Sequence, residues 1–248
     1  METDSSARYR QRIYASYVNA RKEPLAPRTL AGLETRMPYL RHMIRRYLPS
    51  DRRAAILELG CGHGALLYAL LQAGYTQARG VDGSAEQVEA AKQLGVIGIT
   101  QGDVMTALSD TGTASVDVII TFDFIEHLTK SELIPFVDEV HRVLRPGGRW
   151  ILHVPNGESP LAGKIRYSDF THELAFTRTS LTQLLKASGF SDVDCFEDRP
   201  VPHGLRSLIR AILWRIIRIF LVFYIAVETG GIDRRAVFSQ NMLAVALR

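Results

Sequence analysis

The chain has 248 residues in ordinary proportions for a globular protein: 46% are hydrophobic, 23% are charged, and the formal net charge is +4. This length suits one sizeable α/β domain with additions. Two cysteines, Cys61 and Cys195, exclude a disulfide framework and fit a reducing compartment such as the cytoplasm. The first residues lack the apolar core of a signal peptide, and no uncharged apolar stretch reaches transmembrane length.

Charge divides the chain into an acidic body between two basic segments. Residues 1–53 have 12 Lys or Arg against 5 Asp or Glu, whereas residues 54–198 have 10 against 19. Residues 199–227 have five Arg and no acid. Basic flanks suggest an anionic partner such as a membrane surface, nucleic acid or a phosphorylated substrate, although two solvated helix faces would give the same pattern.

The first 53 residues form a basic, helical N-terminal extension. Residues 38–48 have the apolar spacing of an amphipathic helix, with Pro38 in the first turn and three arginines on the outer face. Residues 10–35 have a weaker pattern, which we interpret as helical or irregular.

From residue 54 on, strand and helix patterns alternate, which is typical of a parallel sheet with crossover helices. Ser84 is the expected N-cap of one helix, Ser180 with Gln183 offers a capping box to another, and the turn at 145–148 has Pro and Gly where a type II turn needs them. The expected helices are 64–74, 84–95, 131–144 and 180–190. The expected strands are 54–59, 78–82, one within 96–103, 116–122, 149–156, 193–198 and 241–247.

Three glycines at alternate positions, Gly60, Gly62 and Gly64, follow the first strand in the stretch ELGCGHG. A strand, a tight glycine turn and a helix bring backbone close to a ligand at the carboxyl end of a sheet. Asp82 ends the second strand 22 residues after Gly60, where a carboxylate can accept hydrogen bonds from ribose hydroxyls. These features alone suit NAD and other adenosine ligands equally, and the glycines alone suit a plain turn.

Further motifs decide between these ligands. Asp103 follows the third strand, where it would lie beside an adenine edge, the fourth strand runs into TFDFIEHL, and the fifth follows LRPGG. In this order and spacing the motifs resemble the class I S-adenosylmethionine-dependent methyltransferases, over about residues 54–200 and the last strand. The resemblance implies an α/β fold with a Rossmann-like seven-stranded methyltransferase sheet, N-terminal helices and a helical insert before the last strand. It divides the chain into an extension (1–53), a methyltransferase domain (54–202 and 237–248) and an insert (203–236).

The resemblance also implies a cofactor, S-adenosylmethionine, and residues that bind it. The glycines would admit the methionine part of the cofactor, Asp82 would hold the ribose, and Asp103 with Val104 would hold the adenine. Phe122 and Asp123 would line the floor beneath the sulfonium, although Asp103 would equally cap a turn and Phe122 would equally pack in the core. The implied cofactor-binding residues are Glu58, Gly60, Cys61, Gly62, Gly64, Asp82, Gly83, Asp103, Val104, Phe122 and Asp123.

Two histidines are candidates for activating an acceptor hydroxyl, because such a nucleophile must lose its proton and histidine is the usual base near neutral pH. His127 belongs to a Glu-His pair that is common in small-molecule O-methyltransferases of this fold. His172 lies with Asp169 and Glu173 in the loop 156–178, which overhangs the acceptor site in this fold. These four are the candidate catalytic residues, with a packed histidine and a hydrogen-bonded lid as structural alternatives. The spacing is not that of a metal site, so no metal is expected.

Nucleic acid is not an expected partner, despite the basic flanks. Nucleobase amine methyltransferases usually have an Asn/Asp-Pro-Pro-aromatic motif after the fourth strand, and here residues 123–126 read Asp-Phe-Ile-Glu. The two catalytic cysteines of the cytosine-5 type are also absent, since Cys61 lies in the cofactor loop.

Residues 199–238 replace the short hairpin that joins the last two strands in the plain fold. As one helix, 205–227 would be about 35 Å long. It contains four arginines, each of which costs about 3 kcal/mol at the centre of a bilayer. We therefore expect an interfacial helix on the inner face of the cytoplasmic membrane, with its arginines at the phosphate level and Trp214 among the acyl-facing residues. A homodimer interface or packing on the N-terminal helices is the alternative.

The acceptor is suggested by a less specific resemblance. HELAFTRTSL and the Arg-rich insert after PVPHG resemble bacterial methyltransferases found among surface-glycan biosynthesis proteins. The implied function is O-methylation of a sugar hydroxyl of a lipid-linked or nucleotide-linked glycan precursor. The alternatives are O-methylation of a lipophilic small molecule such as a quinone precursor, and a non-catalytic cofactor-binding scaffold. A polar acceptor pocket around 156–178 would favour the sugar, and an apolar one the quinone precursor.

Overall fold

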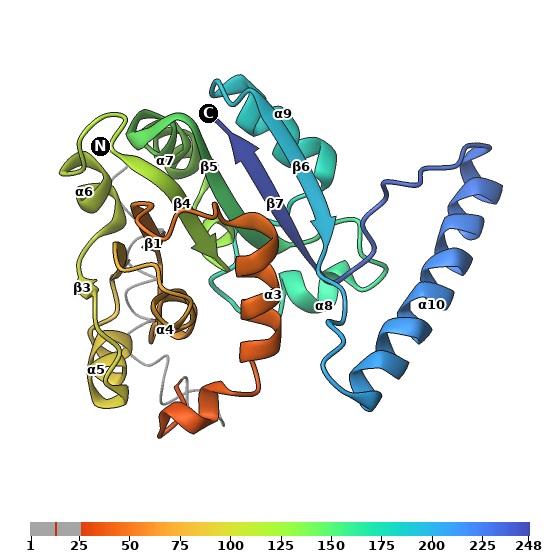
Figure 1. Ribbon diagram of the computed structural model, residues 1–248. Helices are drawn as coiled ribbons and strands as arrows, with labels where there is room; N and C mark the ends of the chain where they lie inside the picture. Colours follow the sequence, from red (N-terminus) through yellow and green to blue (C-terminus); the bar gives the residue numbers. More distant parts are fainter. Residues whose placement is uncertain (1–12, 14–25) are drawn as a thin grey trace.

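The computed structural model describes residue 13 and residues 26–248, which include a central sheet with helices on both faces (Figure 1). The expectations for residues 1–12 and 14–25 lie outside the described residues. A long helix near the C-terminal end of the chain lies beyond one edge of the sheet (Figure 1).

Within the described residues, seven strands form one sheet in the order β3-β2-β1-β4-β5-β7-β6. Strands β1 to β5 pair in parallel, and β7 runs antiparallel between β5 and β6. The central strands are nearly continuous apolar runs because helices cover both faces, and this sheet confirms the predicted fold. The strands are β1 (Ile56–Leu59), β2 (Ala78–Asp82), β3 (Ile99–Gln101), β4 (Val116–Phe122), β5 (Leu144–Pro155), β6 (Asp192–Glu197) and β7 (Asn241–Leu247).

Helices pack on the two faces of the sheet in separate cores. Side chains of α3, α4 and α5 fill the core on one face, and those of α6, α7 and α9 fill the core on the other. The described helical elements are η1 (Leu30–Leu33), α3 (Met37–Tyr47), α4 (Ala65–Gln72), α5 (Ala85–Leu94), α6 (Val104–Ser109), η2 (Ile125–His127), α7 (Lys130–Val143), α8 (Ala162–Arg166), α9 (Arg178–Ala187) and α10 (Leu205–Thr229).

Several local predictions are confirmed. Helix α3 covers the predicted amphipathic segment and buries Leu40, Met43 and Ile44 in the core. Ser84 caps α5, because its hydroxyl accepts a hydrogen bond from the backbone N–H of Gln87. The short helices α6 and α8 were not among the predicted elements.

The predicted start of α9 is wrong by one turn. The capping box is formed by Thr177 and Ser180, not by Ser180 and Gln183. Thr177 has extended backbone and its hydroxyl accepts from the N–H of Ser180 at 3.0 Å, so the helix begins at Arg178. Ser180 therefore sits inside the first turn, where its hydroxyl accepts from the N–H of Thr177.

The predicted turn at 145–148 lies within β5, which begins at Leu144 and not at Arg149. Gly147 adopts a φ of +77°, and its N–H donates to the carbonyl of Arg248 at 3.1 Å. The residues of the turn therefore remain bonded to the sheet, which extends the strand toward its amino end.

Helix α10 lies between β6 and β7 in the sequence and packs beside β6, the edge strand. The indole N–H of Trp214 donates to Glu197 at 3.3 Å, and the guanidinium of Arg218 is 3.2 Å from the same carboxylate. These two side chains therefore face the protein, which corrects the expectation that both lie in the membrane layer. Among the described residues, no helix has the length and apolar character needed to cross a membrane.

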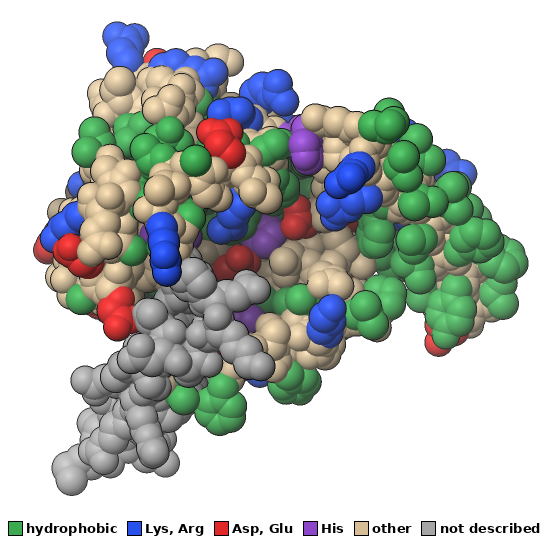
Figure 2. Space-filling view, turned by 90° about the horizontal axis from the view of Figure 1, so that it is seen from below, with side chains coloured by type: hydrophobic (Ala, Val, Ile, Leu, Met, Phe, Trp, Pro, Cys, Tyr) green, Lys and Arg blue, Asp and Glu red, His purple; other side chains and the backbone are tan. Residues whose placement is uncertain are grey.

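The opposite side of α10 is an exposed apolar face (Figure 2). Arg206, Arg210 and Arg215 are also exposed on this helix. The apolar residues are each between 45 and 74% exposed: Leu205, Leu208, Ile209, Ile212, Leu213, Ile216, Ile217, Ile219, Phe220, Phe223, Tyr224 and Val227.

The carboxyl ends of the parallel strands meet at one edge of the sheet, where the connections to the following helices gather. Figure 2 views this edge and shows a hollow with acidic and histidine side chains in it. Ligands of open α/β sheets bind at this edge, so the functional site is expected there.

Candidate functional site

The glycine loop after β1 has a backbone that other residues could not easily adopt. Gly60 has a φ of +72°, and a Cβ there would lie 2.5 Å from the ring of Phe124. Gly62 has a φ of +56°, and its N–H donates to Asp82 at 2.7 Å. The loop is therefore held against the ends of β2 and β4, with backbone in place of side chains on its surface.

Asp82 ties the ends of two strands together. Its second carboxylate oxygen accepts from the N–H of Ser84 at 2.8 Å. Burial raises the pKa of Asp82, although these two backbone N–H groups oppose the rise. Gly83, which follows it, has open space on its Cβ side apart from the Gly102 carbonyl at 3.9 Å. The carboxylate thus lies beside exposed backbone, where the sequence places the ribose.

The side chains of Glu58, before the loop, and Cys61, within it, are both buried. Glu58 is buried, and one of its carboxylate oxygens, Oε2, has no hydrogen-bond partner among the described residues. Burial, with the charge of Asp82, raises the pKa of Glu58 to about 8. Burial also raises the pKa of the Cys61 thiol, whose sulfur packs close to Gly80 of β2. The Cys61 side chain therefore packs in the interior, so its backbone is the part that can face a ligand.

Asp103 has the capping role that the sequence left open. Its carboxylate accepts from the N–H of Thr106 at 2.9 Å and begins α6. The side chain is exposed at the carboxyl edge, and Val104, next to it, is half-buried. Capping leaves Asp103 at the edge of the hollow, so the structure is compatible with the adenine role as well.

A buried histidine links two carboxylates beside the end of β4. His153 of β5 is 3% exposed, and its Nδ1 lies 2.5 Å from Asp123 while its Nε2 lies 3.2 Å from Asp198. Burial alone would lower the pKa of His153, but the two carboxylates outweigh burial and raise it to about 10. The imidazolium in turn lowers the pKa of Asp123 against the effect of its burial. Asp123 is therefore an ionised carboxylate at neutral pH.

Aromatic rings hold this histidine in place. Phe122 stacks on His153 with ring centroids 4.1 Å apart and planes 7° apart. Tyr39 of α3 meets both rings edge-on. Phe122 therefore packs against His153 as well as lying at the end of β4, where the sequence places the cofactor floor.

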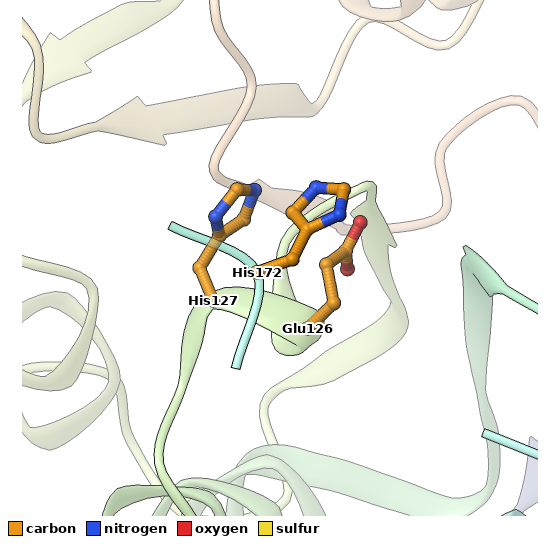
Figure 3. A group of neighbouring side chains, drawn as sticks. All are labelled: Glu126, His127 and His172. Carbon is orange, nitrogen blue, oxygen red and sulfur yellow. The ribbon is translucent and has the colours of Figure 1, made fainter. Parts of the chain in front are cut away.

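A second polar cluster follows directly after Phe124. Glu126 and His127 belong to η2, and His172 comes from the loop after α8. Figure 3 shows the three side chains side by side, with His172 between the other two. One ligand atom from each lies within 4.8 Å of the other two. The tertiary structure thus brings together residues that are 45 positions apart.

The outer hydrogen bonds of the cluster assign the histidine tautomers. The Thr171 hydroxyl donates to Asp169 at 2.7 Å and is 2.9 Å from His127 Nδ1. Since that hydroxyl donates elsewhere, Nδ1 of His127 is the donor and Nε2 holds the lone pair. His172 Nδ1 lies 3.2 Å from the carbonyl of Ile165, which gives the same tautomer.

Burial sets the protonation of the cluster. Burial and the neighbouring carboxylate of Asp123 raise the pKa of Glu126 to about 8. Burial and the neighbouring His172 lower the pKa of His127 to about 4. Near pH 7 the carboxyl is therefore mostly protonated and the imidazole of His127 is neutral.

Backbone contacts fix the loop that contributes His172. The carbonyl of Glu126 accepts from the N–H groups of Glu173 and Leu174 at 2.8 and 3.0 Å. The guanidinium of Arg166 donates to the carbonyls of His172 and Glu173. The predicted catalytic residues therefore divide: His127 and His172 meet, Asp169 acts through Thr171, and Glu173 contributes its backbone to the anchor.

Sequence reasoning missed the pair His153 and Asp198, and it did not include Glu126 among the candidate catalytic residues. His153 stands in the apolar run WILHVP, and a lone polar residue in an expected buried strand was the available signal. No pattern indicated its two partners, which come from different strand ends.

An arginine-lined cavity of about 1120 Å³ lies between α3, β6 and α10. Tyr39 and Asp198 also line it, so the cavity borders the buried His153 and its carboxylate partner Asp198. Arg178 pairs with Asp233 at 2.6 Å and Arg218 with Glu197. The lining arginines are Arg46, Arg178, Arg199, Arg215, Arg218, Arg234 and Arg235.

Comparison with known proteins places the chain in a family. Residues 56–148 match the family described as "Methyltransferase domain". A probable S-adenosylmethionine-dependent methyltransferase of Mycolicibacterium smegmatis is 32% identical over 176 residues, which cover 67% of this chain and 65% of that protein. An uncharacterized methyltransferase of a Synechocystis species is 32% identical over 149 residues, 56% of this chain and 67% of that protein. The chain belongs to the class I S-adenosylmethionine-dependent methyltransferases.

The fold of the methyltransferase agrees with solved structures. A SAM-dependent methyltransferase from Archaeoglobus fulgidus superposes with a TM-score of 0.65 at 19% identity, covering 96% of this chain and 99% of that one. The methyltransferase spans less than two thirds of the length of the Mycolicibacterium relative.

The residues at the carboxyl edge fit S-adenosylmethionine, the cofactor of this family. A Cβ at Gly62 would meet no side chain closer than Gln87 at 3.8 Å, so the space beside this residue is open. The positive φ of Gly62 favours glycine, and the open space leaves room for a ligand beside Asp82. The methyltransferase would hold the cofactor with the 60–64 loop, Asp82 and Asp103, and its floor would be Phe122 and Asp123.

Proposed function

We propose that this methyltransferase is an O-methyltransferase that acts on a sugar hydroxyl of a lipid-linked or nucleotide-linked glycan precursor. S-adenosylmethionine supplies an electrophilic methyl group when it is bound. The observation that carries the proposal is the cluster of Glu126, His127 and His172. Two of its members follow shortly after Phe124, the residue that packs on Gly60. A hydroxyl at this cluster would lie beside the cofactor loop, and two lone-pair nitrogens would assist the loss of its proton.

Polar groups in the overhanging loop favour a hydroxylated acceptor. Asp169 accepts from the Thr171 hydroxyl next to His172, and Glu158 accepts from the backbone N–H of Arg178 at the end of the same loop. An exposed apolar group favours the second candidate, a lipophilic acceptor such as a quinone precursor. Tyr167 is 79% exposed and Phe170 is 80% exposed in the same loop.

We also infer that α10 docks on an anionic membrane surface, where a lipid-linked acceptor would reside. Its outward face is apolar, and Arg206, Arg210 and Arg215 are exposed on the same helix. Apolar residues inserted at the headgroup boundary with arginines at the phosphates are the features of interfacial helices. The arginine-lined cavity beneath α10 supports a phosphate-bearing acceptor by charge.

Radiolabelled S-adenosylmethionine tests the acceptor class. Purified protein would be incubated with membrane-lipid and soluble fractions of the source cells. Label in an acid-labile lipid-linked glycan or in a nucleotide sugar supports the proposal, whereas label in an acid-stable aromatic lipid favours the quinone precursor. We expect His127→Ala and His172→Ala to lower turnover at least about 100-fold while cofactor binding remains. Asp82→Ala should instead weaken cofactor binding.

Vesicle sedimentation tests the docking of α10. We expect the protein to sediment with phosphatidylglycerol vesicles more than with phosphatidylcholine vesicles, and we expect Phe220→Glu to abolish this. Thr229→Glu, at the end of the helix, is the control for added charge. A protein that ignores vesicles and forms a dimer that Phe220→Glu dissociates would assign the apolar face to a second copy.

A further inference from the structure

We propose that Glu126, His127 and His172 form a binding site for a divalent transition-metal ion. The three side chains come from two segments, and one ligand atom from each lies within 4.8 Å of the others (Figure 3). Two imidazoles and one carboxylate suit zinc, manganese, iron or cobalt, whereas magnesium and calcium favour all-oxygen sites. Three protein ligands would leave positions on the ion for other ligands.

Glu126 points to a missing ligand. It is 1% exposed, and neither of its carboxylate oxygens has a hydrogen-bond partner among the described residues. A buried carboxyl without a partner is costly and needs a proton or a cation. In Figure 3 its carboxylate lies beside the ring of His172, and His127 lies on the other side of that ring. A cation bound by the three groups would satisfy both orphaned oxygens.

The hydrogen bonds around the cluster are those that metal-binding histidines need. His172 Nδ1 is 3.2 Å from the carbonyl of Ile165, and His127 Nδ1 is 2.9 Å from the hydroxyl of Thr171. Metal-ligating histidines commonly donate one ring N–H to a carbonyl or a carboxylate-linked group, which fixes the tautomer and makes the other nitrogen a better ligand. Asp169 completes such a chain behind His127, through Thr171.

The site is also held in place before any ion binds. The carbonyl of Glu126 accepts two N–H groups from Glu173 and Leu174, which ties the loop of His172 to η2. Arg166 binds the carbonyls of His172 and Glu173 from the other side. A histidine held this firmly costs little to bring to a metal ion, whereas a lid that only covers the acceptor would not need this anchor.

The role of the ion rests on the proposed function, with one change: the ion activates the hydroxyl in place of the two histidines, because their lone pairs would bind the ion. The ion would take the acceptor hydroxyl as a ligand and lower the pKa of that hydroxyl. The hydroxyl proton then passes to solvent water. The oxygen–carbon bond forms as the sulfur–carbon bond of the sulfonium breaks, and the bonding pair stays on sulfur. The products are a methyl ether, S-adenosylhomocysteine and the released proton.

Cobalt(II) binding tests the site without any acceptor. The full chain, treated with chelator and dialysed, would be titrated with Co²⁺ and followed by visible absorption and equilibrium dialysis. We expect one tightly bound Co²⁺ per chain with histidine-type ligand-field bands. Glu126→Gln, His127→Gln and His172→Gln should each weaken binding at least about 100-fold. His203→Gln, at an exposed histidine before α10, is the matched control and should bind as the parent protein does.

The outcomes separate the metal site from the proposed function. Absence of a tight Co²⁺ site, or cobalt binding that the three variants leave unchanged, overturns the metal site. S-adenosylhomocysteine binding, measured by calorimetry on each variant, reports whether the cofactor site is intact. If Glu126→Gln does not fold, His172→Gln decides the test, since it changes a half-buried loop residue. A bound ion with no methyl transfer to any hydroxyl acceptor would overturn the proposed function alone, and unchanged transfer by chelated enzyme would overturn the role of the ion.

Discussion

Buried polar residues at the carboxyl edge distinguish this protein from a bare cofactor fold. Asp123 has a φ of +53°, a backbone conformation that costs energy for a residue with a side chain. The carboxylate in that position is 2.5 Å from His153, which a second carboxylate, Asp198, holds from the other side. The strained residue thus places an ionised oxygen at the end of β4, beside the buried imidazolium of His153.

The charge of His153 predicts a specific dependence of stability on pH. Its pKa is about 10 in the folded protein and 6.5 when unperturbed, so the imidazolium contributes all of its stabilisation below pH 6.5 and loses it as the pH rises toward 10. Relative to His153→Gln, the free energy of unfolding should fall by about 2 kcal/mol between about pH 6.5 and 8. Urea unfolding of both proteins at the two pH values measures this difference. An equal gap at both pH values would mean that His153 is neutral in the fold.

At the scale of elements, α10 is attached to the sheet along one side. Glu197 of β6 accepts from Trp214 and the N–H of Phe238, and it pairs with Arg218. Arg218 also donates to the carbonyls of Arg234 and Ala236, which return the chain to β7. These half-buried polar contacts attach α10 to β6 and fix which side of the helix faces outward.

Glu197→Ala should release α10 while leaving the sheet folded. The variant removes the shared acceptor and leaves the Arg218 guanidinium without its carboxylate. The Arg218 side chain is 28% exposed and can regain water in the variant. We therefore expect the free energy of unfolding to fall by about 2 kcal/mol, which is less than the cost of breaking a fully buried ion pair. Trypsin should cut within 199–236 faster than in the parent protein. Glu228→Ala, at the exposed end of α10, is the control. Equal cleavage of both variants would contradict the attachment of α10 through Glu197.

At the scale of the whole molecule, the insert contacts the sheet beside its β6 edge and is packed separately from the two cores. β6 and β7 pair in register up to Glu197 and Met242, so their ends already lie together without the insert. The two cores on the faces of the sheet contain no residue of α10 among the described residues. The cofactor edge therefore does not depend on α10 for its packing.

Replacing residues 203–236 with a short Gly-Ser linker should leave a folded protein. A shorter loop between paired strand ends costs less closure entropy, and the cores remain intact. We expect cofactor binding to stay within about threefold of the parent value, and vesicle binding to disappear. Calorimetry with S-adenosylhomocysteine and vesicle sedimentation measure the two properties. A truncated protein that has lost cofactor binding would show that α10 supports the site.

The local parts of the site could be predicted from the sequence, because each depends on a few neighbouring residues. The glycines of the 60–64 loop, Asp82 and Asp103 follow strand ends, so the strand pattern alone places them at one edge. His127 and His172 were candidates because the family resemblance places the Glu-His pair and the loop 156–178 beside the acceptor. The meeting of His172 with Glu126 and His127 could not be predicted, because it depends on how the loop after α8 folds back over η2.

The sequence by itself determined the alternation of strands and helices, the cofactor edge and the presence of a long basic and apolar helix, since periodicity and short motifs are local properties of the chain. The tertiary structure alone decided that His153 joins Asp123 to Asp198 and that Trp214 and Arg218 face inward, which leaves an apolar face outward. Contacts between distant segments depend on the packing of the whole sheet, and packing is a property that no single stretch of sequence contains.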